Sequence, residues 1–558
     1  MRGLICCFIL FAGNGFTQNN PPLQKLASEF FAWRAVTQPA TGDDIPRVER
    51  PDGWVPNYSP EALKAYRGKY VEFGDQLSAI PRDGWTRADS VDYLLLRSAI
   101  ERVNWELNVL RLPQRNPAFY VQQTLGALYE LLLIQSPMTD ARARNIILRL
   151  NSFPATIEHA QRNLSEPVAA FARIALAELD HSGDRLSQTA AALKKVMQKS
   201  YHSKLDLAVK RGAEALARYK DWLESQRPDM RARFNVGREG YTYFLKNVAL
   251  MPLSPKELLR MGRLAWARSV AFDVYERLRN SKIPAAALFA SAEAQVEQSQ
   301  KDEAAIREFL VEKGIMSVPD WLHHYRNAKT PATVAPLAFM GVADDLTSET
   351  RLDEDAVSYI PEPSRDLPFF RLASAQDPRP IIVHEGVPGH YFQLARSWAN
   401  PDPIRRHYFD SGANEGIGFY VEELMLQFGL FDDRPHTREI IYRFMRLRAL
   451  RVDVDVNLAI GKYTIEDAGK YLAATVPMDA QTAVQEAGFF AATPGQAISY
   501  QIGKLQILQL IADAKIRLGN KFSLRDYHDY MMENGNVPIA LQRWEYLGLT
   551  DEIRKLWQ

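Results

Sequence analysis

The 558-residue sequence contains only two cysteines, Cys6 and Cys7, and both lie close to the N-terminus. Around them, Arg2 precedes the apolar run 4–12, and small residues follow at Gly13 and Gly15. This order is typical of a secretory signal peptide over residues 1–17, so we expect a secreted or periplasmic protein; a buried N-terminal strand is the alternative. The mature chain would then have no disulfide, no thiolate metal ligand and no cysteine nucleophile.

The sequence also lacks an excess of charge of either sign and lacks long apolar runs. Lys and Arg number 68 against 67 Asp and Glu, whereas nucleic-acid-binding proteins usually carry a basic excess, so we expect no nucleic-acid partner. The run 4–12 is too short to cross a bilayer as a helix, and mean hydropathy is -0.27. We therefore expect no transmembrane span in the mature chain. With 46% hydrophobic and 24% charged residues, the composition is that of an ordered globular protein.

Apolar residues with helical spacing occupy most of the mature chain. Leu23, Leu26 and Phe30 open the first such segment, 23–36, and Ser254 followed by Pro255 is typical of a helix start. Further helices are predicted over 91–112, 119–135, 141–150, 190–199 and 205–223, with breaks at 113–114, 136–137 and 182–184. Seven prolines between residues 330 and 383 indicate short strands or an extended connector there. The expected fold is mainly α, with minor short strands before the motif described next.

A heptad with the order His-Glu-Gly-Val-Pro-Gly-His begins at His384 and ends at His390. In the common zinc motif His-Glu-x-x-His, the histidines are four residues apart and share one face of a helix, with the Glu beside the first His near a water at the metal. A separation of six in a regular helix would leave the rings about 120° apart. Pro388 and Gly389 can break the helix and bulge out, which would return His390 to the face of His384. Glu385 is then the candidate general base.

A catalytic zinc site needs a third protein ligand. Glu415 lies 25 residues after His390, and Glu422 follows seven residues later on the same predicted helix face. Two unpaired carboxylates on one buried face would be unfavourable without a cation, so we expect Glu415 as the third ligand, with Glu422 in contact with a ligand or as its substitute. In the alternative, both face solvent while Ile417 and Val421 are buried.

These residues, taken with others further along the chain, resemble the bacterial family "domain of unknown function 885". The resemblance is clear from about residue 380 onward and weak before 240. Its motifs in this sequence are the heptad, Glu415-Gly416 with Tyr420 and Glu422, Arg451 with Asp455, Pro494-Gly495-Gln496-Ala497-Ile498-Ser499-Tyr500, Tyr527-His528-Asp529 and Gly535-Asn536-Val537-Pro538.

The resemblance implies a largely α-helical, secreted or periplasmic protein, distantly similar to helical zinc peptidases of the angiotensin-converting-enzyme and oligopeptidase kind. Those enclose a channel between two helical halves, so we expect an N-terminal helical region over 18–240 and a metal-binding catalytic region over 241–558. By the same similarity His384, His390 and Glu415 are the metal ligands and Glu385 the general base. Tyr500 matches a family tyrosine that could stabilise an oxyanion.

The sequence departs from the family pattern at several polar positions. Ile417 stands where the family has Trp, Ala459 where it commonly has His, and Phe489 and Phe490 where it has an Arg-Tyr pair. These departures keep the expected metal residues but put substrate specificity and turnover in question.

The leading hypothesis is a zinc metallopeptidase acting on short peptides. Glu385 would move the proton, and Tyr500 or Arg451 would stabilise the oxyanion. In the structural alternative Tyr500 is a buried aromatic residue, and Arg451 pairs with Asp455 on its own helix. A non-catalytic metal-containing binding protein and a metal-free helical protein are the rival hypotheses, and another divalent transition metal could replace Zn²⁺.

Overall fold

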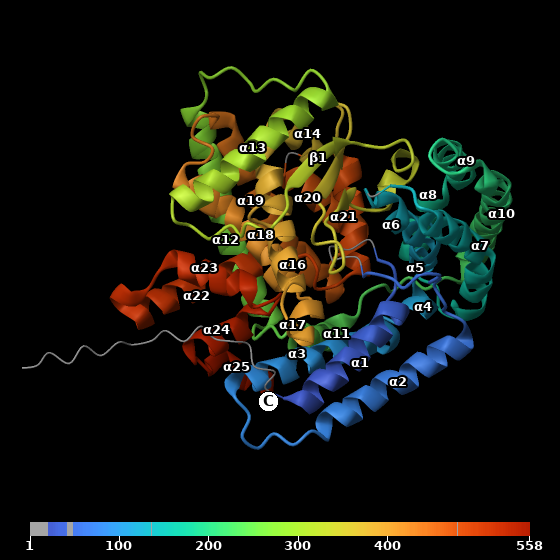
Figure 1. Cartoon of the computed structure of the whole chain (residues 1–558), viewed down its shortest axis with the longest axis horizontal. Helices are drawn as coiled ribbons and strands as arrows, with labels where there is room; N and C mark the ends of the chain where they lie inside the picture. The colour runs from blue at the N-terminus through green and yellow to red at the C-terminus, as the bar shows by residue number, and fades with distance from the viewer. Residues whose placement is uncertain (1–19, 42–47, 136, 477, 558) are drawn as a thin grey trace, which may run out of the picture.

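The computed structural model describes residues 20–41, 48–135, 137–476 and 478–557. The predicted signal peptide, with Cys6 and Cys7, lies outside these residues. The described chain is mainly α-helical with three short strands, as the sequence predicts (Figure 1).

Eleven α-helices precede residue 250 in the described part of the chain. They are α1 (Pro21–Thr37), α2 (Pro60–Ser78), α3 (Arg87–Asn104), α4 (Leu112–Arg115), α5 (Pro117–Val121), α6 (Ala127–Leu133), α7 (Asp140–Asn163), α8 (Ala169–Leu179), α9 (Ser182–Leu193), α10 (His202–Gln226) and α11 (Gly237–Tyr243).

The α-helices of the second part include those that carry the heptad and the two candidate carboxylates. They are α12 (Pro255–Arg279), α13 (Ala292–Glu312), α14 (Phe369–Gln376), α15 (Arg379–Ile381), α16 (His390–Trp398), α17 (Pro403–His407), α18 (Ser411–Phe428), α19 (Pro435–Ala459), α20 (Ile465–Thr475), α21 (Ala480–Ala492), α22 (Ile498–Leu518), α23 (Leu524–Glu533), α24 (Ile539–Leu547) and α25 (Asp551–Trp557).

Short turns of other helical types link or extend these helices. The π-helical turns are η1 (Trp105–Val109), η2 (Gln122–Gly126), η5 (Phe244–Val248) and η7 (Ile382–Gly386). The 3₁₀ turns are η3 (Lys199–Tyr201), η4 (Arg227–Asp229), η6 (Ala335–Met340) and η8 (Gly519–Lys521).

Local capping explains where several helices begin. At the start of α12 the Ser254 side chain accepts from the Glu257 backbone N–H, the Glu257 side chain accepts from Ser254 N, and Pro255 opens the helix, as the sequence predicts. The prediction of a break at 182–184 and a helix over 190–199 was wrong, since α9 begins at Ser182 and ends at Leu193. The predicted helix 91–112 also divides, because α3 passes into η1 at Trp105.

The three strands lie before the heptad, where the prolines indicated short strands. They are β1 (Tyr325–Lys329), β2 (Asp344–Asp345) and β3 (Ala356–Ile360) in the order β1-β3-β2. β1 pairs with β3 in parallel, with Tyr325 opposite Ala356, and β2 pairs with β3 antiparallel. The sheet thus brings residues near 325 and 345 to the region of the heptad.

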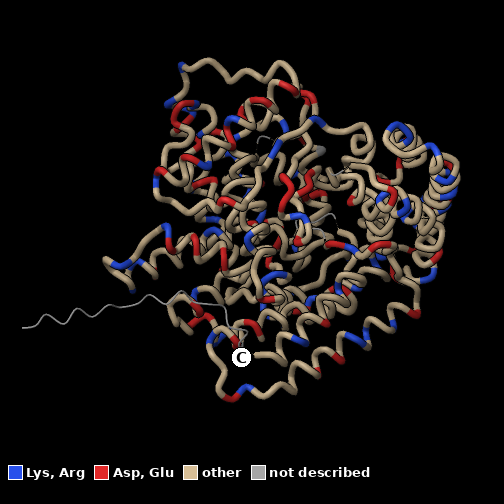
Figure 2. The backbone as a smooth tube through the Cα atoms, in the orientation of Figure 1, with Lys and Arg blue, Asp and Glu red and all other residues tan. Residues whose placement is uncertain are grey.

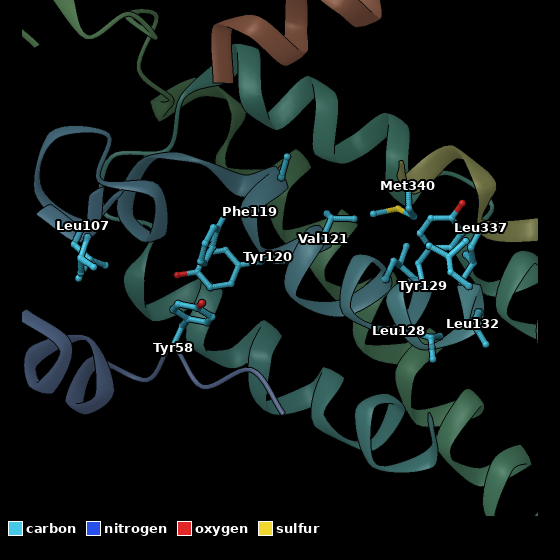
Figure 3. Packing of buried hydrophobic residues seen from close by; sticks show 14 of the residues in the cluster. Tyr58, Leu107, Phe119, Tyr120, Val121, Leu128, Tyr129, Leu132, Leu337 and Met340 are labelled. Atoms are coloured by element: carbon cyan, nitrogen blue, oxygen red, sulfur yellow. The ribbon is translucent and has the colours of Figure 1, made fainter. Parts of the chain in front are cut away.

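Two large hydrophobic clusters form most of the core. The first joins the N-terminal helices; in Figure 3 Tyr58, Phe119 and Tyr120 lie together between Leu107 on one side and Leu337 and Met340 on the other. The second surrounds α16, α18, α22 and α23, and in Figure 1 the labels α16 and α18 lie near the middle of the molecule. Burying 13 of the 18 residues of α18 fixes this helix in place. The division of the chain at residue 240 stays a prediction.

Basic and acidic residues occur throughout the described chain. Figure 2 shows basic and acidic residues interspersed along the backbone rather than separated by sign. Among the described residues, no helix has the combination of length and apolar character that crossing a membrane requires.

Candidate metal centre

The two histidines of the heptad lie side by side although their spacing does not fit one helix. His384 lies in η7, the chain leaves helical geometry after Gly386, and His390 opens α16. His390 therefore comes to lie beside His384 because one helix ends and another begins between them, rather than because a single helix bulges. The ring centroids are 4.6 Å apart with the planes at 75°. A Cβ on Gly389 would lie 1.8 Å from the His384 carbonyl oxygen, so only glycine fits this turn.

α18 presents its carboxylates to these two rings. Asp410 caps the helix by accepting from Ala413 N at 2.7 Å. Gly418 allows the rings to approach the helix, because a Cβ there would lie 2.8 Å from His390 Cε1 and 2.9 Å from His384 Cε1. Both Glu415 and Glu422 are buried, so the alternative in which they face solvent is wrong. The close approach brings Glu415 to both histidines.

Three ligand atoms meet in this space. Glu415 Oε2 lies 3.4 Å from His384 Nε2 and 3.3 Å from His390 Nε2. Zn–N and Zn–O bonds of about 2.0–2.1 Å in a tetrahedron place ligand atoms about 3.3–3.4 Å apart, which matches both distances. The three atoms form a set that could hold a metal, and Glu415 Oε2 is buried with no hydrogen-bond partner in the described structure. The residues therefore fit a zinc ion.

The charge state of Glu415 also suits a metal ligand. Burial acts to raise the pKa of its carboxyl group, but His390 and His384 outweigh this effect and hold the pKa well below its ordinary value. Glu415 is thus an ionised carboxylate in a buried site, and such a group needs positive charge beside it.

A second layer of side chains orients His384. Glu422 Oε1 lies 2.7 Å from His384 Nδ1 and 2.9 Å from Arg448 Nη1 of α19, so Glu422 is placed behind the first ligand rather than among the three. Such a carboxylate on the far nitrogen fixes the tautomer and orientation of a metal-binding histidine. Burial and Arg448 lower the pKa of His384, but Glu415 and Glu422 outweigh them and raise it to about 9.

Arg448 was not among the site residues predicted from the sequence. Its Nη2 lies 3.4 Å from the His384 ring nitrogens, and the side chain is buried. Its position three residues before Arg451, on the same face of a helix, is the signal that could have identified it.

Glu385 is the part of the heptad that reaches open space. Its side chain is 25% exposed, and Oε2 lies 4.0 Å from His390 Nε2. Burial is the largest effect on this carboxyl group and raises its pKa, with a further contribution from Asp344. Glu385 therefore lies beside the three ligand atoms without being one of them, as a proton acceptor in this site would.

A cavity of ≈ 860 Å³ opens onto the site. His384, Glu385, His390 and Glu415 line it at one place, together with Tyr500. More distant parts of the lining come from η2, α6 and α7, from the loops around β2 and from the start of α14. The chain thus gives the candidate metal centre space for a ligand larger than water.

Tyr500 and Arg451 lie together on the wall of this cavity. The Tyr500 ring stacks near His384, with centroids 6.4 Å apart and planes at 11°, and the Arg451 guanidinium lies 4.6 Å from the Tyr500 ring centroid. Arg451 Nε donates to Glu486 Oε2 at 2.9 Å. Asp455 instead accepts backbone N–H groups of the segment 495–498, so the proposed Arg451–Asp455 pair was wrong.

The positions that depart from the family pattern have different environments. Phe489 and Phe490 line the cavity, whereas Ile417 and Ala459 are buried in hydrophobic clusters. Phe489 and Phe490 would therefore face a ligand in the cavity.

His528 lies apart from the metal centre: its Nε2 is 2.9 Å from the Tyr420 hydroxyl and its Nδ1 is 2.8 Å from the Ile315 carbonyl oxygen.

Comparisons with known proteins place these observations in a family. The family model described as "Bacterial protein of unknown function (DUF885)" matches residues 39–335 and 374–544. A search of curated proteins found no match.

Two solved structures share the fold. One, from Shewanella oneidensis, is described as a putative lipoprotein of unknown function; it has a TM-score of 0.70 and 16% identity, and the match covers 94% of this chain and 99% of that one. The other, described as a putative lipoprotein from Colwellia psychrerythraea, has a TM-score of 0.72 and 20% identity, with coverage of 96% and 97%. Matches of nearly full length on both sides show that nearly all of the chain shares its fold with these structures.

Proposed function

This chain belongs to the bacterial family of unknown function DUF885, and we propose that it is a zinc-dependent hydrolase, most simply a metallopeptidase acting on short peptides. One observation carries the proposal. Glu415 Oε2 lies from His384 Nε2 and from His390 Nε2 at the distance expected between two ligands of a tetrahedral zinc ion, and Glu385 lies beside these atoms at the wall of a large cavity.

The ligand set would be His384, His390 and Glu415, with Glu422 and Arg448 holding His384 in place. When bound, zinc would supply Lewis-acid polarisation of a substrate carbonyl and a lowered pKa for water. Glu385 accepts the proton of the attacking water and delivers it to the leaving nitrogen.

A group on the cavity wall would support the reaction by stabilising the oxyanion. Tyr500, whose ring stacks near His384, would donate to the developing oxyanion. Arg451 is held by Glu486 and lies against the Tyr500 ring, so we assign it the positioning of Tyr500 rather than direct contact with the oxyanion.

Short peptides are the substrates that the site favours. The ligand atoms are buried and are reached through the cavity, which excludes the surface of a folded protein but accommodates a few residues of extended chain. An extracytoplasmic location is supported by the signal-peptide-like N-terminus and by the description of both solved relatives as putative lipoproteins.

A second candidate function is a non-catalytic metal-containing binding protein. It is favoured by the pairing of Arg451 with Glu486 and by the phenylalanines at 489 and 490, which leave fewer polar groups on the wall to act on a substrate. In that case the metal centre would hold a ligand without cleaving it.

Metal analysis of protein purified without a histidine tag tests the proposal first. We expect near-stoichiometric zinc in the wild type and none after His390→Ala. A panel of short peptides then separates the two candidate functions: the hydrolase cleaves at least one, stops after chelation and recovers when zinc is restored. Stoichiometric zinc with no cleavage of any peptide would favour the binding protein, and absence of metal would overturn both.

A further inference from the structure

The outward face of α12 carries large apolar side chains that no described part of the protein covers. Leu264, Val274, Tyr275 and Leu278 are 67%, 55%, 60% and 74% exposed. Single exposed apolar residues are normal on any protein, but a group of four on one helix is not.

These four side chains form a continuous stripe. At 100° per residue they fall within an arc of about 100°, and from Leu264 to Leu278 the stripe is about 21 Å long. Ala267 and Ala271 fall within the same arc. The stripe thus has the width and length of an apolar face that normally packs against another surface.

Exposed basic residues flank the stripe near both of its ends. On the helical wheel Arg263 and Arg277 lie on one side, Arg268 and Arg279 on the other, and Arg260 precedes the stripe. Arg268 also contacts Glu423 of α18 at 3.4 Å but stays 58% exposed.

Acidic residues of α12 are kept off this face. Asp273 is buried on the opposite side of the helix and contacts Arg277 at 3.1 Å and Arg446 of α19 at 3.5 Å. Glu276 is also buried there and contacts Arg279 at 2.9 Å and Arg438 of α19 at 3.2 Å. Glu257 in the first turn is the exposed acid of the helix. The outward face is therefore apolar along its centre and positive along its edges.

We propose that this face of α12 is a docking surface for a bilayer that contains anionic phospholipid. The apolar stripe enters the boundary between headgroups and acyl chains, the arginines contact lipid phosphates, and the helix lies in the plane of the interface. Tyr275 suits this boundary because its ring is apolar and its hydroxyl is polar.

Charge complementarity selects this occupant over two others. A second copy of the chain docked by the same face would bring arginines against arginines across a twofold axis, which is unfavourable. A nucleic acid would place its phosphates over four large apolar side chains instead of over the basic edges.

Sedimentation of the full chain with vesicles tests the proposal without any need for enzymatic activity. We expect binding to vesicles of equal parts phosphatidylcholine and phosphatidylglycerol, and weaker binding to phosphatidylcholine alone. Arg263→Glu with Arg277→Glu should lower binding to the mixed vesicles by about tenfold or more. Leu264→Ser with Leu278→Ser should weaken binding as well, because it removes the apolar anchor.

A second 25-residue helix provides a matched control. α10 also exposes an apolar residue, Leu207, but mixes Glu214 with Lys210 and Arg211 on its surface. Leu207→Ser with Lys210→Glu should leave vesicle binding unchanged, and circular dichroism melts should show that all variants are folded.

Three results would overturn the proposal. These are equal wild-type binding to both kinds of vesicle, undiminished binding by folded α12 variants, and a wild-type dimer that light scattering shows to dissociate in the Leu264→Ser, Leu278→Ser variant. The last result would assign the face to a second copy of the chain.

Discussion

α18 and α12 are long helices that place polar and apolar side chains in opposite ways. α18 is buried on nearly every side yet carries Glu415 and Glu422 into the interior. α12 is half exposed yet presents Leu264 and Leu278 to the outside. Each arrangement is unfavourable on its own: a buried carboxylate needs a cation, and an exposed apolar stripe needs a cover. The buried carboxylates of α18 therefore point to a bound cation, and the exposed apolar stripe of α12 points to a partner surface that covers it.

The two sites also differ in how firmly their side chains are held. At the metal centre Glu422 of α18 and Arg448 of α19 hold His384 in place, so function there depends on distances of a few tenths of an ångström. On α12 the apolar side chains are unrestrained, and function depends on area and charge. Conservative substitutions should therefore damage the first site and leave the second working.

The largest effect is expected for Glu385→Gln at the metal centre. The amide keeps the size of the side chain but cannot take a proton, so peptide hydrolysis should fall about 10²–10⁴-fold. Zinc content should not change, because Glu385 is not among the three ligand residues. Glu130→Gln, which alters another acid of the cavity lining, serves as the control. An active Glu385→Gln enzyme would remove Glu385 from the mechanism.

A pH-dependent loss of stability is expected at His528, which contacts Tyr420 of α18. Burial lowers the pKa of His528 to about 4 from an ordinary 6.5. As pH falls, His528 therefore becomes protonated in the unfolded chain before it does so in the folded protein. The contribution of neutral His528 to the free energy of unfolding is complete above pH 6.5 and is lost between pH 6.5 and 4. It amounts to about 3 kcal/mol. Denaturant unfolding at pH 7 and pH 4 should show this loss in the wild type but not in His528→Gln; equal losses in both would contradict it.

A smaller effect is expected for Glu422→Gln, which keeps the ligands but weakens the support of His384. Zinc affinity should fall about 10–100-fold, measured by competition with a chelator. The neighbouring Glu423→Gln is the matched control, since Glu423 contacts Lys504 at 2.9 Å instead of a ligand. Equal affinity in both variants would show that Glu422 does not orient His384.

The smallest effect is expected for Leu278→Ser on α12. Because this side chain is exposed and contacts lipid only in the proposed docked state, the free energy of unfolding should change by no more than about 0.5 kcal/mol. Leu426→Ser on α18, where the side chain is buried, should destabilise by about 2–5 kcal/mol. Thermal melts of the two variants measure the contrast, and a large loss in Leu278→Ser would mean that the stripe packs within the protein.

Periodicity and capping located several of the helices that the structure contains. The apolar spacing of Leu23, Leu26 and Phe30 identified α1, and Ser254 with Pro255 marked the start of α12. The prediction failed at Ser182, where a local Ser-Gly-Asp signal reads equally well as a break or as a helix start. Tertiary packing chose between them.

The candidate ligands His384, His390 and Glu415 could be identified from the sequence alone. Imidazole and carboxylate side chains bind zinc, and their order and spacing along the chain can be read directly. The sequence could not determine which atoms meet. Tertiary structure decided that His390 returns by starting a new helix, that Glu422 lies behind His384, and that Arg448 joins them. It also decided that Leu264 and Leu278 stay uncovered. The physical reason is that contacts between distant segments depend on how whole helices pack, which no local pattern encodes.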